Sequence, residues 1–319
     1  MTPLKLVVHS CVALCIMTIL HTNSDELLGT RRFDVQANVT CNNNHTARGA
    51  IVTMLSTVNE DYINLVLVLG HSIDLYDYVN CNIDRILMIH DDAVFSHKTR
   101  ALLKRAGWML KIVSQIAPPD GVNNLTVKHE RYLKCFSKIH AFNLTQYETV
   151  LLLDADTMLC GNVMELFIQY ATRMHEVGVH LAWARDTPHK SNPNSSFNAG
   201  VMLIRPSNAL TQHLIENSNR IAFDYAYSEQ GYLTAIFNSS NPTPSGSTYR
   251  QYLILPQKFN LMATIAITDN ALWQETWQDA RIFHFTWLKP TAPFLLPRCA
   301  CVGTLHFCGM WKRIHDQLL

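Results

Sequence analysis

The sequence has little charge and no strong excess of either sign. Among its 319 residues, 26 lysines and arginines stand against 25 aspartates and glutamates, so the formal net charge is +1, and only 16% of the residues are charged. A nucleic-acid-binding protein needs a basic surface, which this balance argues against. The chain also has no internal repeat. Because 48% of its residues are hydrophobic and its length is within reach of one large domain, we expect one main globular unit with short additions at its ends.

The N-terminus lacks an apolar run as long as a typical membrane-spanning helix, which needs about 20 residues. Residues 6–20 carry no charge and follow Lys5, but this run has only fifteen residues. It is close to the upper limit of a signal-peptide core, which is about 7–15 residues. No convincing small-x-small cleavage site lies near Ser24. A signal peptide and a signal anchor over residues 1–24 are both left open, and the anchor is slightly favoured.

A targeting segment predicts where the rest of the chain lies. Lys5 favours a cytoplasmic N-terminus with the bulk of the protein in the lumen of the secretory pathway. We therefore expect a type II protein of the Golgi membrane, or a secreted protein if the segment is cleaved, with a polar, Asn-rich stem over residues 25–47. Six Asn-x-Ser/Thr sequons agree with a lumenal location: Asn38, Asn44, Asn124, Asn143, Asn194 and Asn238.

Cysteine pairing is a second feature that depends on the compartment. Of nine cysteines, two lie in the N-terminal run, and the remaining seven are an odd number, so at least one thiol should be unpaired in an oxidising compartment. Cys299, Cys301, His306 and Cys308 could hold a zinc ion, but the two-plus-two spacing of structural zinc motifs is missing. We therefore favour disulfide stapling of a Cys-rich C-terminal tail, residues 291–319.

From residue 48 onward, strands and helices alternate, which is typical of an α/β domain whose sheet is covered by helices on both faces. Apolar runs predict strands at 50–55, 85–90, 108–116, 150–153, 179–184 and 200–204. Helices are predicted at 62–73, 96–107, 162–174 and 207–223. The first of these helices is apolar on all sides and should be buried. The segment 238–249, rich in Asn, Pro, Ser and Gly, is predicted to be a loop or a lid.

Two carboxylates follow directly on one of the predicted buried strands. Asp154 and Asp156 come after the apolar run 150–153, at the strand end where open α/β sheets bind ligands. Such a pair suits Mg²⁺ or Mn²⁺, which completes its ligand shell with phosphate oxygens and water. An Asp-x-Asp tripeptide also fits a turn with a helix-capping Asp. The haloacid-dehalogenase phosphatases use Asp-x-Asp as well, but Met158 stands where they need Thr or Val, and the motif lies in mid-chain.

Seven ordered segments together resemble glycosyltransferase family 8, the glycogenin-like group with the GT-A fold. They are 51–55 (IVTML), 67–72 (LVLGHS), 136–147 (FSKIHAFNLTQY), 151–157 (LLLDADT), 197–207 (FNAGVMLIRPS), 229–233 (EQGYL) and 284–290 (HFTWLKP). The resemblance implies a Rossmann-like mixed sheet flanked by helices, in a single catalytic domain over residues 48–290. It also implies transfer of a hexose from a UDP-sugar to a glycan, protein or lipid acceptor, with retention of anomeric configuration and with Mn²⁺ or Mg²⁺ as cofactor.

The resemblance also assigns the residues that would bind the metal and the diphosphate. Asp154 and Asp156, with Ala155 between them, resemble the carboxylate ligands, and His284 resembles a third, imidazole ligand. Lys138 and Lys289 resemble the cations that approach the diphosphate.

A second group of residues would contact the sugar and the uridine. Asn198, Ala199 and Gly200 resemble the donor-sugar loop, and Tyr62 and Asn59 match the region that holds uridine.

Gln230 matches a glutamine near the reacting sugar carbon, so Gln230 and the neighbouring Glu229 are the candidate catalytic residues. The chain departs from the family pattern at two places. Glu229 replaces the usual Asp, and the His284–Lys289 spacing is shorter than in glycogenin, with Trp287 between them.

Two other functions compete with this one. A self-glucosylating, glycogenin-like primer fits poorly, because priming belongs to the cytosol and this chain carries a lumenal signal. A GT-A-like module that binds sugar or nucleotide without catalysis is disfavoured, because the residues expected to bind metal and diphosphate are all present. A homodimer is an assembly that the sequence leaves open.

Overall fold

A computed structural model describes residues 48–76, 78, 81–123, 125–127, 130–186, 197–238, 251–291, 299 and 304–318. The expected targeting segment and stem, residues 1–47, lie outside the described residues, and so does most of the expected loop at 238–249. No helix among the described residues is long and apolar enough to cross a membrane.

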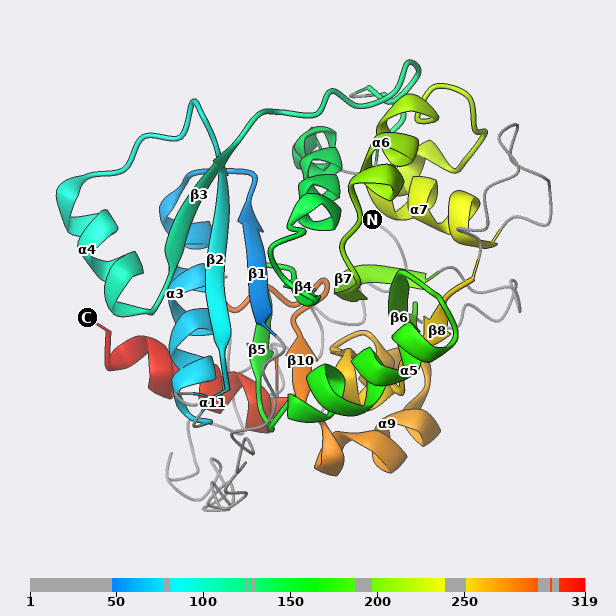
Figure 1. Cartoon of the computed structure of the whole chain (residues 1–319). Coiled ribbons are helices and arrows are strands. Elements are labelled where there is room, and N and C mark those ends of the chain that lie inside the picture. Colours follow the sequence, from blue (N-terminus) through cyan, green and yellow to red (C-terminus); the bar gives the residue numbers. More distant parts are fainter. Residues whose placement is uncertain are drawn as a thin grey trace.

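A seven-stranded mixed sheet forms the centre of the molecule, in the order β3-β2-β1-β4-β7-β6-β8 (Figure 1). Its strands are β1 (Gly49–Leu55), β2 (Ile83–His90), β3 (Met109–Val113), β4 (Thr149–Leu153), β6 (Leu181–Arg185), β7 (Phe197–Ile204) and β8 (Leu253–Ile254). Strands β3, β2, β1 and β4 run parallel, whereas β7 is antiparallel to both β4 and β6. The predicted α/β class with a mixed sheet is confirmed.

A smaller sheet lies beyond the end of β4 and brings distant parts of the chain together. It has the order β5-β10-β9, with β5 (Thr157–Leu159), β9 (Leu261–Met262) and β10 (Ile282–His284). β10 pairs antiparallel with β5, so that His284 lies opposite Thr157. β5 starts one residue after Asp156, and the register therefore places His284 beside the Asp-Ala-Asp turn.

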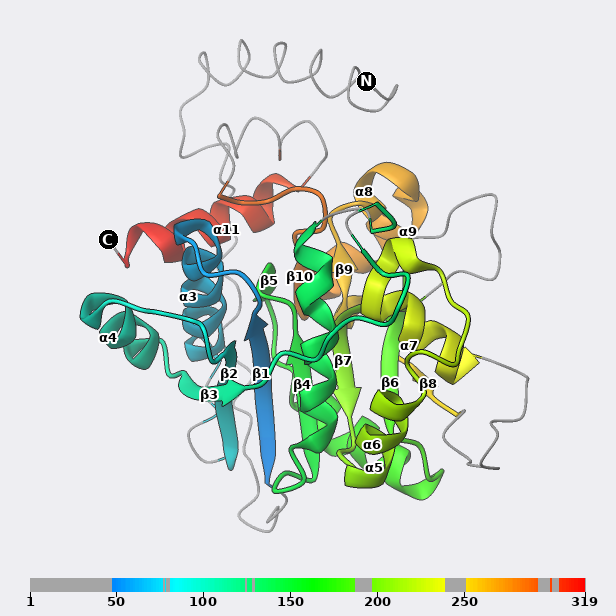
Figure 2. The same cartoon turned by 90° about the horizontal axis from the view of Figure 1, so that it is seen from above.

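Successive residues of the central strands enter two different hydrophobic cores, because side chains alternate between the faces of a sheet. Ile51 and Leu151 pack on one face with helices α3 (Glu60–Asp74), α4 (His97–Arg105) and α11 (Leu305–Asp316). Val52 and Leu152 pack on the other face with η1 (Glu130–Asn143), α6 (Asn208–Glu216) and α7 (Ser228–Asn238). Figure 2 shows α3 and α11 on the opposite side of the sheet from α6.

Helix α3 is buried around its whole circumference in its central turns, as its apolar sequence predicts. It packs against β1 and β5 on one side and against α4 and α11 on others. Its N-cap is Asn59, whose Oδ1 accepts a hydrogen bond from Tyr62 N at 2.9 Å. This bond satisfies one of the backbone amides left free at a helix start.

The predicted helix 162–174 is interrupted. Asn162 Oδ1 accepts from Met164 N at 2.7 Å, as a starting cap should, but Glu165 pairs with Lys258 at 2.9 Å rather than closing a capping box. A π-helical segment, η2 (Leu166–Tyr170), then precedes α5 (Ala171–Glu176). The apolar residues of this segment, including Met174, are nevertheless packed against the core.

Two other predicted elements are too long. The helix expected at 207–223 ends at Glu216, because Asn217 Nδ2 and Ser218 Oγ donate to the carbonyls of His213 and Ile215 and satisfy the helix end locally. The strand expected at 108–116 ends at Val113, which pairs with His90, the last residue of β2. Beyond that point Ile116 N donates to Ser137 Oγ of η1 at 3.0 Å, so the chain bonds to η1 instead of pairing with β2.

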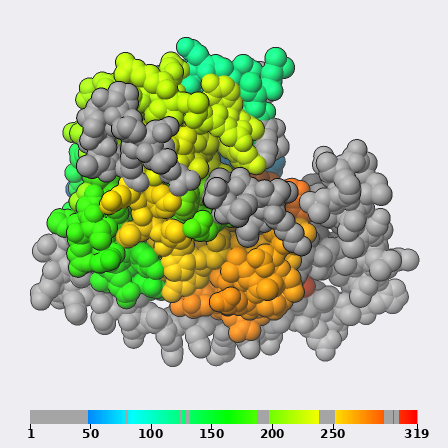
Figure 3. All heavy atoms as spheres, turned by 90° about the vertical axis from the view of Figure 1, so that its right-hand side faces the viewer, coloured from blue at the N-terminus to red at the C-terminus, as the bar shows by residue number. Residues whose placement is uncertain are grey.

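Five short helical elements complete the described part of the fold. They are η3 (Tyr225–Tyr227), η4 (Gln257–Phe259), α8 (Ile265–Thr268), α9 (Asn270–Thr276) and η5 (Trp277–Asp279). In Figure 3 the α6–α7 region (lime) lies above α8 and α9 (orange), and the chain from residue 251 crosses between them.

The described part of the C-terminal tail is integrated into the main core. α11 packs against α3, and the Phe307 ring stacks on Phe283 of β10 with centroids 4.1 Å apart. Cys299 and Cys308 form a disulfide, which confirms the stapling interpretation and removes two ligands of the alternative zinc site. Among the described cysteines, Cys160 is buried and forms no disulfide, in agreement with the expectation that at least one cysteine stays unpaired.

Candidate active site

A cavity of about 550 Å³ lies at the carboxyl end of β4. β7 runs antiparallel to β4, with Val201 opposite Leu153, so the beginning of β7 reaches the same edge. Twelve of the thirteen predicted site residues line this cavity: Tyr62, Lys138, Asp154, Ala155, Asp156, Asn198, Ala199, Gly200, Glu229, Gln230, His284 and Lys289. The exception is Asn59, whose side chain is exposed and caps α3 beside Tyr62.

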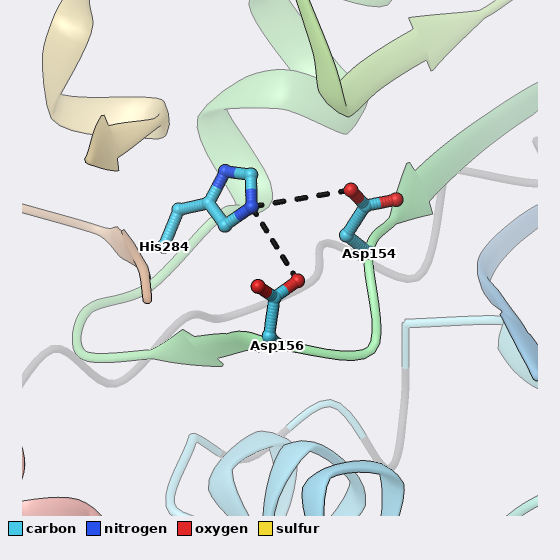
Figure 4. Close-up of side chains that lie close together, drawn as sticks. All are labelled: Asp154, Asp156 and His284. Atoms are coloured by element: carbon cyan, nitrogen blue, oxygen red, sulfur yellow. Dashed lines mark ion pairs between the residues drawn. The ribbon is translucent and has the colours of Figure 1, made fainter. Parts of the chain in front are cut away.

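The three residues that the sequence predicts as metal ligands, Asp154, Asp156 and His284, lie together and could hold a metal ion (Figure 4). One ligand atom from each of the three lies within 4.8 Å of the others. His284 Nε2 points between the acids, 3.9 Å from Asp154 Oδ2 and 3.5 Å from Asp156 Oδ1. Two carboxylates and one imidazole suit a divalent cation such as Mn²⁺ or Mg²⁺, and this donor set fits the expected ion.

The Asp-Ala-Asp turn is tight because its backbone is bonded on both sides. Thr157 N and Thr157 Oγ1 both donate to Asp154 O, at 3.1 and 2.8 Å. Asp154 N donates to Gly200 O at 2.8 Å, and Phe285 N donates to Asp156 O at 2.9 Å. The turn is thereby tied to β7 and to the residue after β10, which carry other parts of the site.

Two lysines neutralise the acids in this structure. Lys138 Nζ lies 2.5 Å from Asp154 Oδ1 and 2.8 Å from Glu229 Oε1, and Lys289 Nζ contacts Asp156 Oδ2. Burial opposes the charged form of Lys138, but the two acids raise its pKa well above its usual value. Burial likewise opposes ionisation of Asp154, but Lys138 outweighs it and lowers the pKa of that carboxyl. Both groups of this pair are therefore charged at neutral pH.

Burial has the dominant effect on Glu229 and His284. It raises the pKa of Glu229, although Lys138 acts in the opposite direction. It lowers the pKa of His284 to about 4, although Asp154 acts to raise it. His284 is therefore a neutral imidazole at pH 7, which is the form that binds a metal.

The expected donor-sugar loop is held by a network of amides. Asn198 Oδ1 accepts from Gly200 N at 3.0 Å and from Asn260 Nδ2 at 2.9 Å. Gln230 Oε1 accepts from Ala199 N at 3.1 Å. These bonds leave the Asn198 and Gln230 side chains at the cavity wall in fixed orientations.

Gly200 is required by close packing. A Cβ added there would overlap Cε1 of His284 and would lie 2.8 Å from its Nδ1. Only a residue without a side chain lets the imidazole approach β7 this closely.

Asp186 and Asn260 are among the polar residues of the site that sequence reasoning missed. Asp186 lines the cavity one residue after β6 and accepts from Gln230 Nε2 at 2.9 Å. Its position after an apolar strand is the same signal that identified Asp154. Asn260 is fully buried, and its Oδ1 lies 3.0 Å from His284 Nδ1. It stands among apolar residues in the sequence, and no motif indicates it.

The shorter loop after His284 has an unusual backbone. Trp287 has φ of 63° and lines the cavity with a side chain that is 43% exposed. A bulky residue rarely adopts this left-handed conformation. The loop nevertheless brings Lys289 into the cavity, despite its departure from the glycogenin spacing.

Comparison with known proteins agrees with this site. The family model described as Glycosyl transferase family 8 matches residues 54–290. UDP-glucuronate:xylan alpha-glucuronosyltransferase 2 of Arabidopsis thaliana is 29% identical over 191 residues, covering 60% of this chain and 27% of that protein. Glycogenin-2 of Homo sapiens is 27% identical over 240 residues, covering 74% of this chain and 42% of that protein. The chain thus spans less than half the length of either curated relative.

Solved structures share the fold. Apo mouse xyloside xylosyltransferase 1 aligns with a TM-score of 0.51 and 14% identity, covering 77% of this chain and 99% of that chain. The fold is therefore one that glycosyltransferases use, as expected. With the family model matching most of its length and the predicted ligands gathered in one cavity, the chain belongs to glycosyl transferase family 8.

Proposed function

We propose that this protein transfers a hexose from a UDP-sugar to an acceptor, with retention of configuration and dependence on a divalent metal. The observation that carries the proposal is the convergence of Asp154, Asp156, His284 and two lysines in one cavity. The xylan glucuronosyltransferase among the relatives has UDP-glucuronate in its name, which supports a UDP-linked donor. A glycan is the favoured acceptor class, with protein and lipid as the alternatives.

Asp154, Asp156 and His284 would hold Mn²⁺ or Mg²⁺. When bound, the ion supplies positive charge where negative charge develops on the UDP leaving group. Lys138 and Lys289 supply further positive charge. When the donor binds, each lysine must replace a contact with a carboxylate by a contact with a diphosphate oxygen. Tyr62, at the cavity wall beside the start of α3, provides a face for the uracil ring.

The donor sugar would lie against Asn198, Gln230 and Asp186. Gln230 is bonded at both ends of its amide, to Ala199 N and to Asp186 Oδ2, so it presents a fixed dipole to the sugar. Glu229 is not free to act as a nucleophile, because its carboxylate holds Lys138. We assign Glu229 the role of positioning that lysine.

The proposed reaction is a front-face displacement. The bond between the anomeric carbon and the β-phosphate oxygen breaks, and the acceptor hydroxyl oxygen bonds to the same face of that carbon. The acceptor proton passes to the departing β-phosphate oxygen. No protein nucleophile is needed, and the role of the cavity is to orient the two substrates and stabilise the developing charge.

We further propose that the catalytic domain acts in the lumen of the secretory pathway, on the basis of residues 6–20 and the sequons. The protein expressed in a eukaryotic cell should lose mass when treated with an N-glycan-removing enzyme. It should also be protected from protease in sealed microsomes. A cytosolic, unglycosylated product would contradict this location.

The proposed activity is tested with a panel of UDP-sugars and the full-length protein. We expect one donor to release UDP in a Mn²⁺-dependent manner and the transferred sugar to keep its anomeric configuration by proton NMR. UDP binding without release or transfer from any donor would instead favour a non-catalytic sugar- or nucleotide-binding module. An inverted product would refute the front-face mechanism.

A further inference from the structure

Asn260 is a buried amide that contacts two different parts of the site. It follows η4 and directly precedes β9, whose Met262 pairs with His284 of β10. Its backbone is fixed by Gln257, whose carbonyl accepts from Asn260 N at 2.9 Å and whose side chain donates to Asn260 O at 2.7 Å. Local structure therefore holds this side chain in place independently of any ligand.

The orientation of the Asn260 amide follows from a backbone donor. Gly200 N can only donate, and it lies 3.0 Å from the side chain of Asn198, which must present its oxygen there. The same oxygen is 2.9 Å from Asn260, which must present its NH₂ group to it. The oxygen of Asn260 is then the atom that lies 3.0 Å from His284 Nδ1.

This orientation selects one tautomer of His284. An amide oxygen only accepts hydrogen bonds, so Nδ1 of the neutral imidazole must carry the proton and donate it. Nε2 then has its lone pair, and Nε2 is the atom that faces Asp154 and Asp156. A metal ligand needs this unprotonated nitrogen.

Without Asn260, the metal-free protein would favour the other neutral tautomer of His284, in which Nε2 carries the proton. The carboxylates attract a proton to Nε2, where it could bond to Asp156 at the present separation of 3.5 Å. That proton would block the position that a cation needs. The buried Nδ1–H, in turn, would lose its acceptor if the Asn260 oxygen were removed.

We propose that Asn260 is a positioning residue with two roles. Its oxygen presets His284 for metal binding, and its NH₂ group holds Asn198 in the orientation that contacts the donor sugar. The sugar role rests on the proposed function, whereas the metal role requires only that the cation bind at His284. Asn260 thereby links the metal ligand and the sugar-binding amide through one side chain.

The test compares the full-length wild type with Asn260→Leu, which keeps a similar volume without hydrogen-bonding atoms. In ¹⁵N-histidine-labelled protein without metal, His284 is identified as the signal missing from His284→Gln. Wild type should show a protonated Nδ1 and an unprotonated Nε2, and Asn260→Leu should shift toward protonated Nε2. The Mn²⁺ affinity of Asn260→Leu should fall about 10–100-fold, as is typical when a residue that hydrogen-bonds to a metal ligand is lost. The affinity is measured with UDP present, by electron paramagnetic resonance of free Mn²⁺.

Asn217→Leu is a matched control. Asn217 is also buried, and its Nδ2 lies 3.2 Å from His213 Nδ1 at the end of α6, outside the cavity lining. The control variant should lose stability without changing the His284 signal or Mn²⁺ affinity.

Asn260→Asp separates the two roles, because it keeps an acceptor for Nδ1–H and removes the donor to Asn198. It should retain the wild-type tautomer and Mn²⁺ affinity within about threefold, but lose the affinity advantage of the UDP-sugar over UDP. A wild-type tautomer and Mn²⁺ affinity in Asn260→Leu would overturn the proposal. If Asn260→Leu does not fold, a 10–100-fold loss of Mn²⁺ affinity in Asn260→Asp would overturn it. These measurements require no turnover, so a wild type that binds Mn²⁺ but transfers no sugar would refute only the proposed function.

Discussion

Replacing Gly200 with alanine should damage the metal site by steric contact alone. The new Cβ would overlap Cε1 of His284 and would lie 2.8 Å from its Nδ1 and 2.9 Å from Asn198 Oδ1. The ring cannot simply turn away, because Nδ1 is bonded to Asn260 and the side chain is buried. Either β7 or His284 must therefore shift.

The size of the effect follows from packing. An extra methyl group in a filled core costs about 1–3 kcal/mol, and replacing glycine returns about 0.4–1 kcal/mol through the unfolded chain. The net loss of about 0–2.6 kcal/mol corresponds to a fall in Tm of up to roughly 10 °C for a domain of this size. Displacement of His284 should also weaken Mn²⁺ binding. We expect a loss of about 10–100-fold in affinity, as when a residue that hydrogen-bonds to a metal ligand is removed.

The assay is a thermal melt combined with a Mn²⁺ titration in the presence of UDP. Gly178→Ala is the control, because no atom lies within 4 Å of its added Cβ, but its φ of +73° makes the variant strained. The control should therefore lose stability without losing Mn²⁺ affinity. Unchanged Mn²⁺ affinity in Gly200→Ala would show that the imidazole does not lie against β7, and the assigned geometry would be wrong.

Three further predictions address the sugar, the pH dependence and the short loop. Gln230→Ala should lower the transfer rate about 10²-fold, because the sugar is misplaced, while UDP affinity measured by calorimetry changes little. Equal losses of transfer rate and UDP affinity would mean that the wrong loop is assigned to the sugar. Burial lowers the pKa of His284 from 6.5 to about 4, so its contribution to stability is present above pH 6.5 and is lost as the pH falls toward 4. The Tm should therefore fall more steeply across this pH range for wild type than for His284→Asn. Parallel curves would contradict the buried neutral ring. Trp287→Gly should keep or raise the Tm, because it relieves a positive φ that costs about 1–3 kcal/mol, and a fall of several degrees would mean that contacts of the indole outweigh the strain.

The sequence predicts local features of the fold well. The apolar run of β4 ending in Asp154 identifies both a buried strand and an acidic turn, because the two signals lie next to each other. The helix predicted to start at residue 96 does begin there, capped by Ser96, whose Oγ accepts from Thr99 N at 3.0 Å. Such features depend on a few neighbouring residues.

Features that depend on distant residues are less accessible from the sequence. Lys138 and Glu229 are 91 positions apart and meet only because η1 packs against α7. His284 reaches Asp156 through the pairing of β10 with β5, so its assignment required the resemblance to a family. Asn260 had neither a motif nor a local signal, and only the structure brings it beside His284.

The most direct test of the metal site is Asp156→Asn, which keeps the shape of the side chain and removes its charge. Lys289 is 32% exposed, but the Asp156 side chain is only 9% exposed, so losing this pair costs more than losing a surface pair. The variant also loses the repulsion between Asp156 and Asp154, and we expect it to stay folded. In wild type with UDP, Mn²⁺ at 100 times its Kd should add about 2.7 kcal/mol of stability, and the variant should show much less. Mn²⁺-dependent transfer should fall by about 10²–10³. Full Mn²⁺-dependent transfer by Asp156→Asn, or outright unfolding of the variant, would show that the Asp-Ala-Asp turn is structural and that the proposed mechanism is wrong.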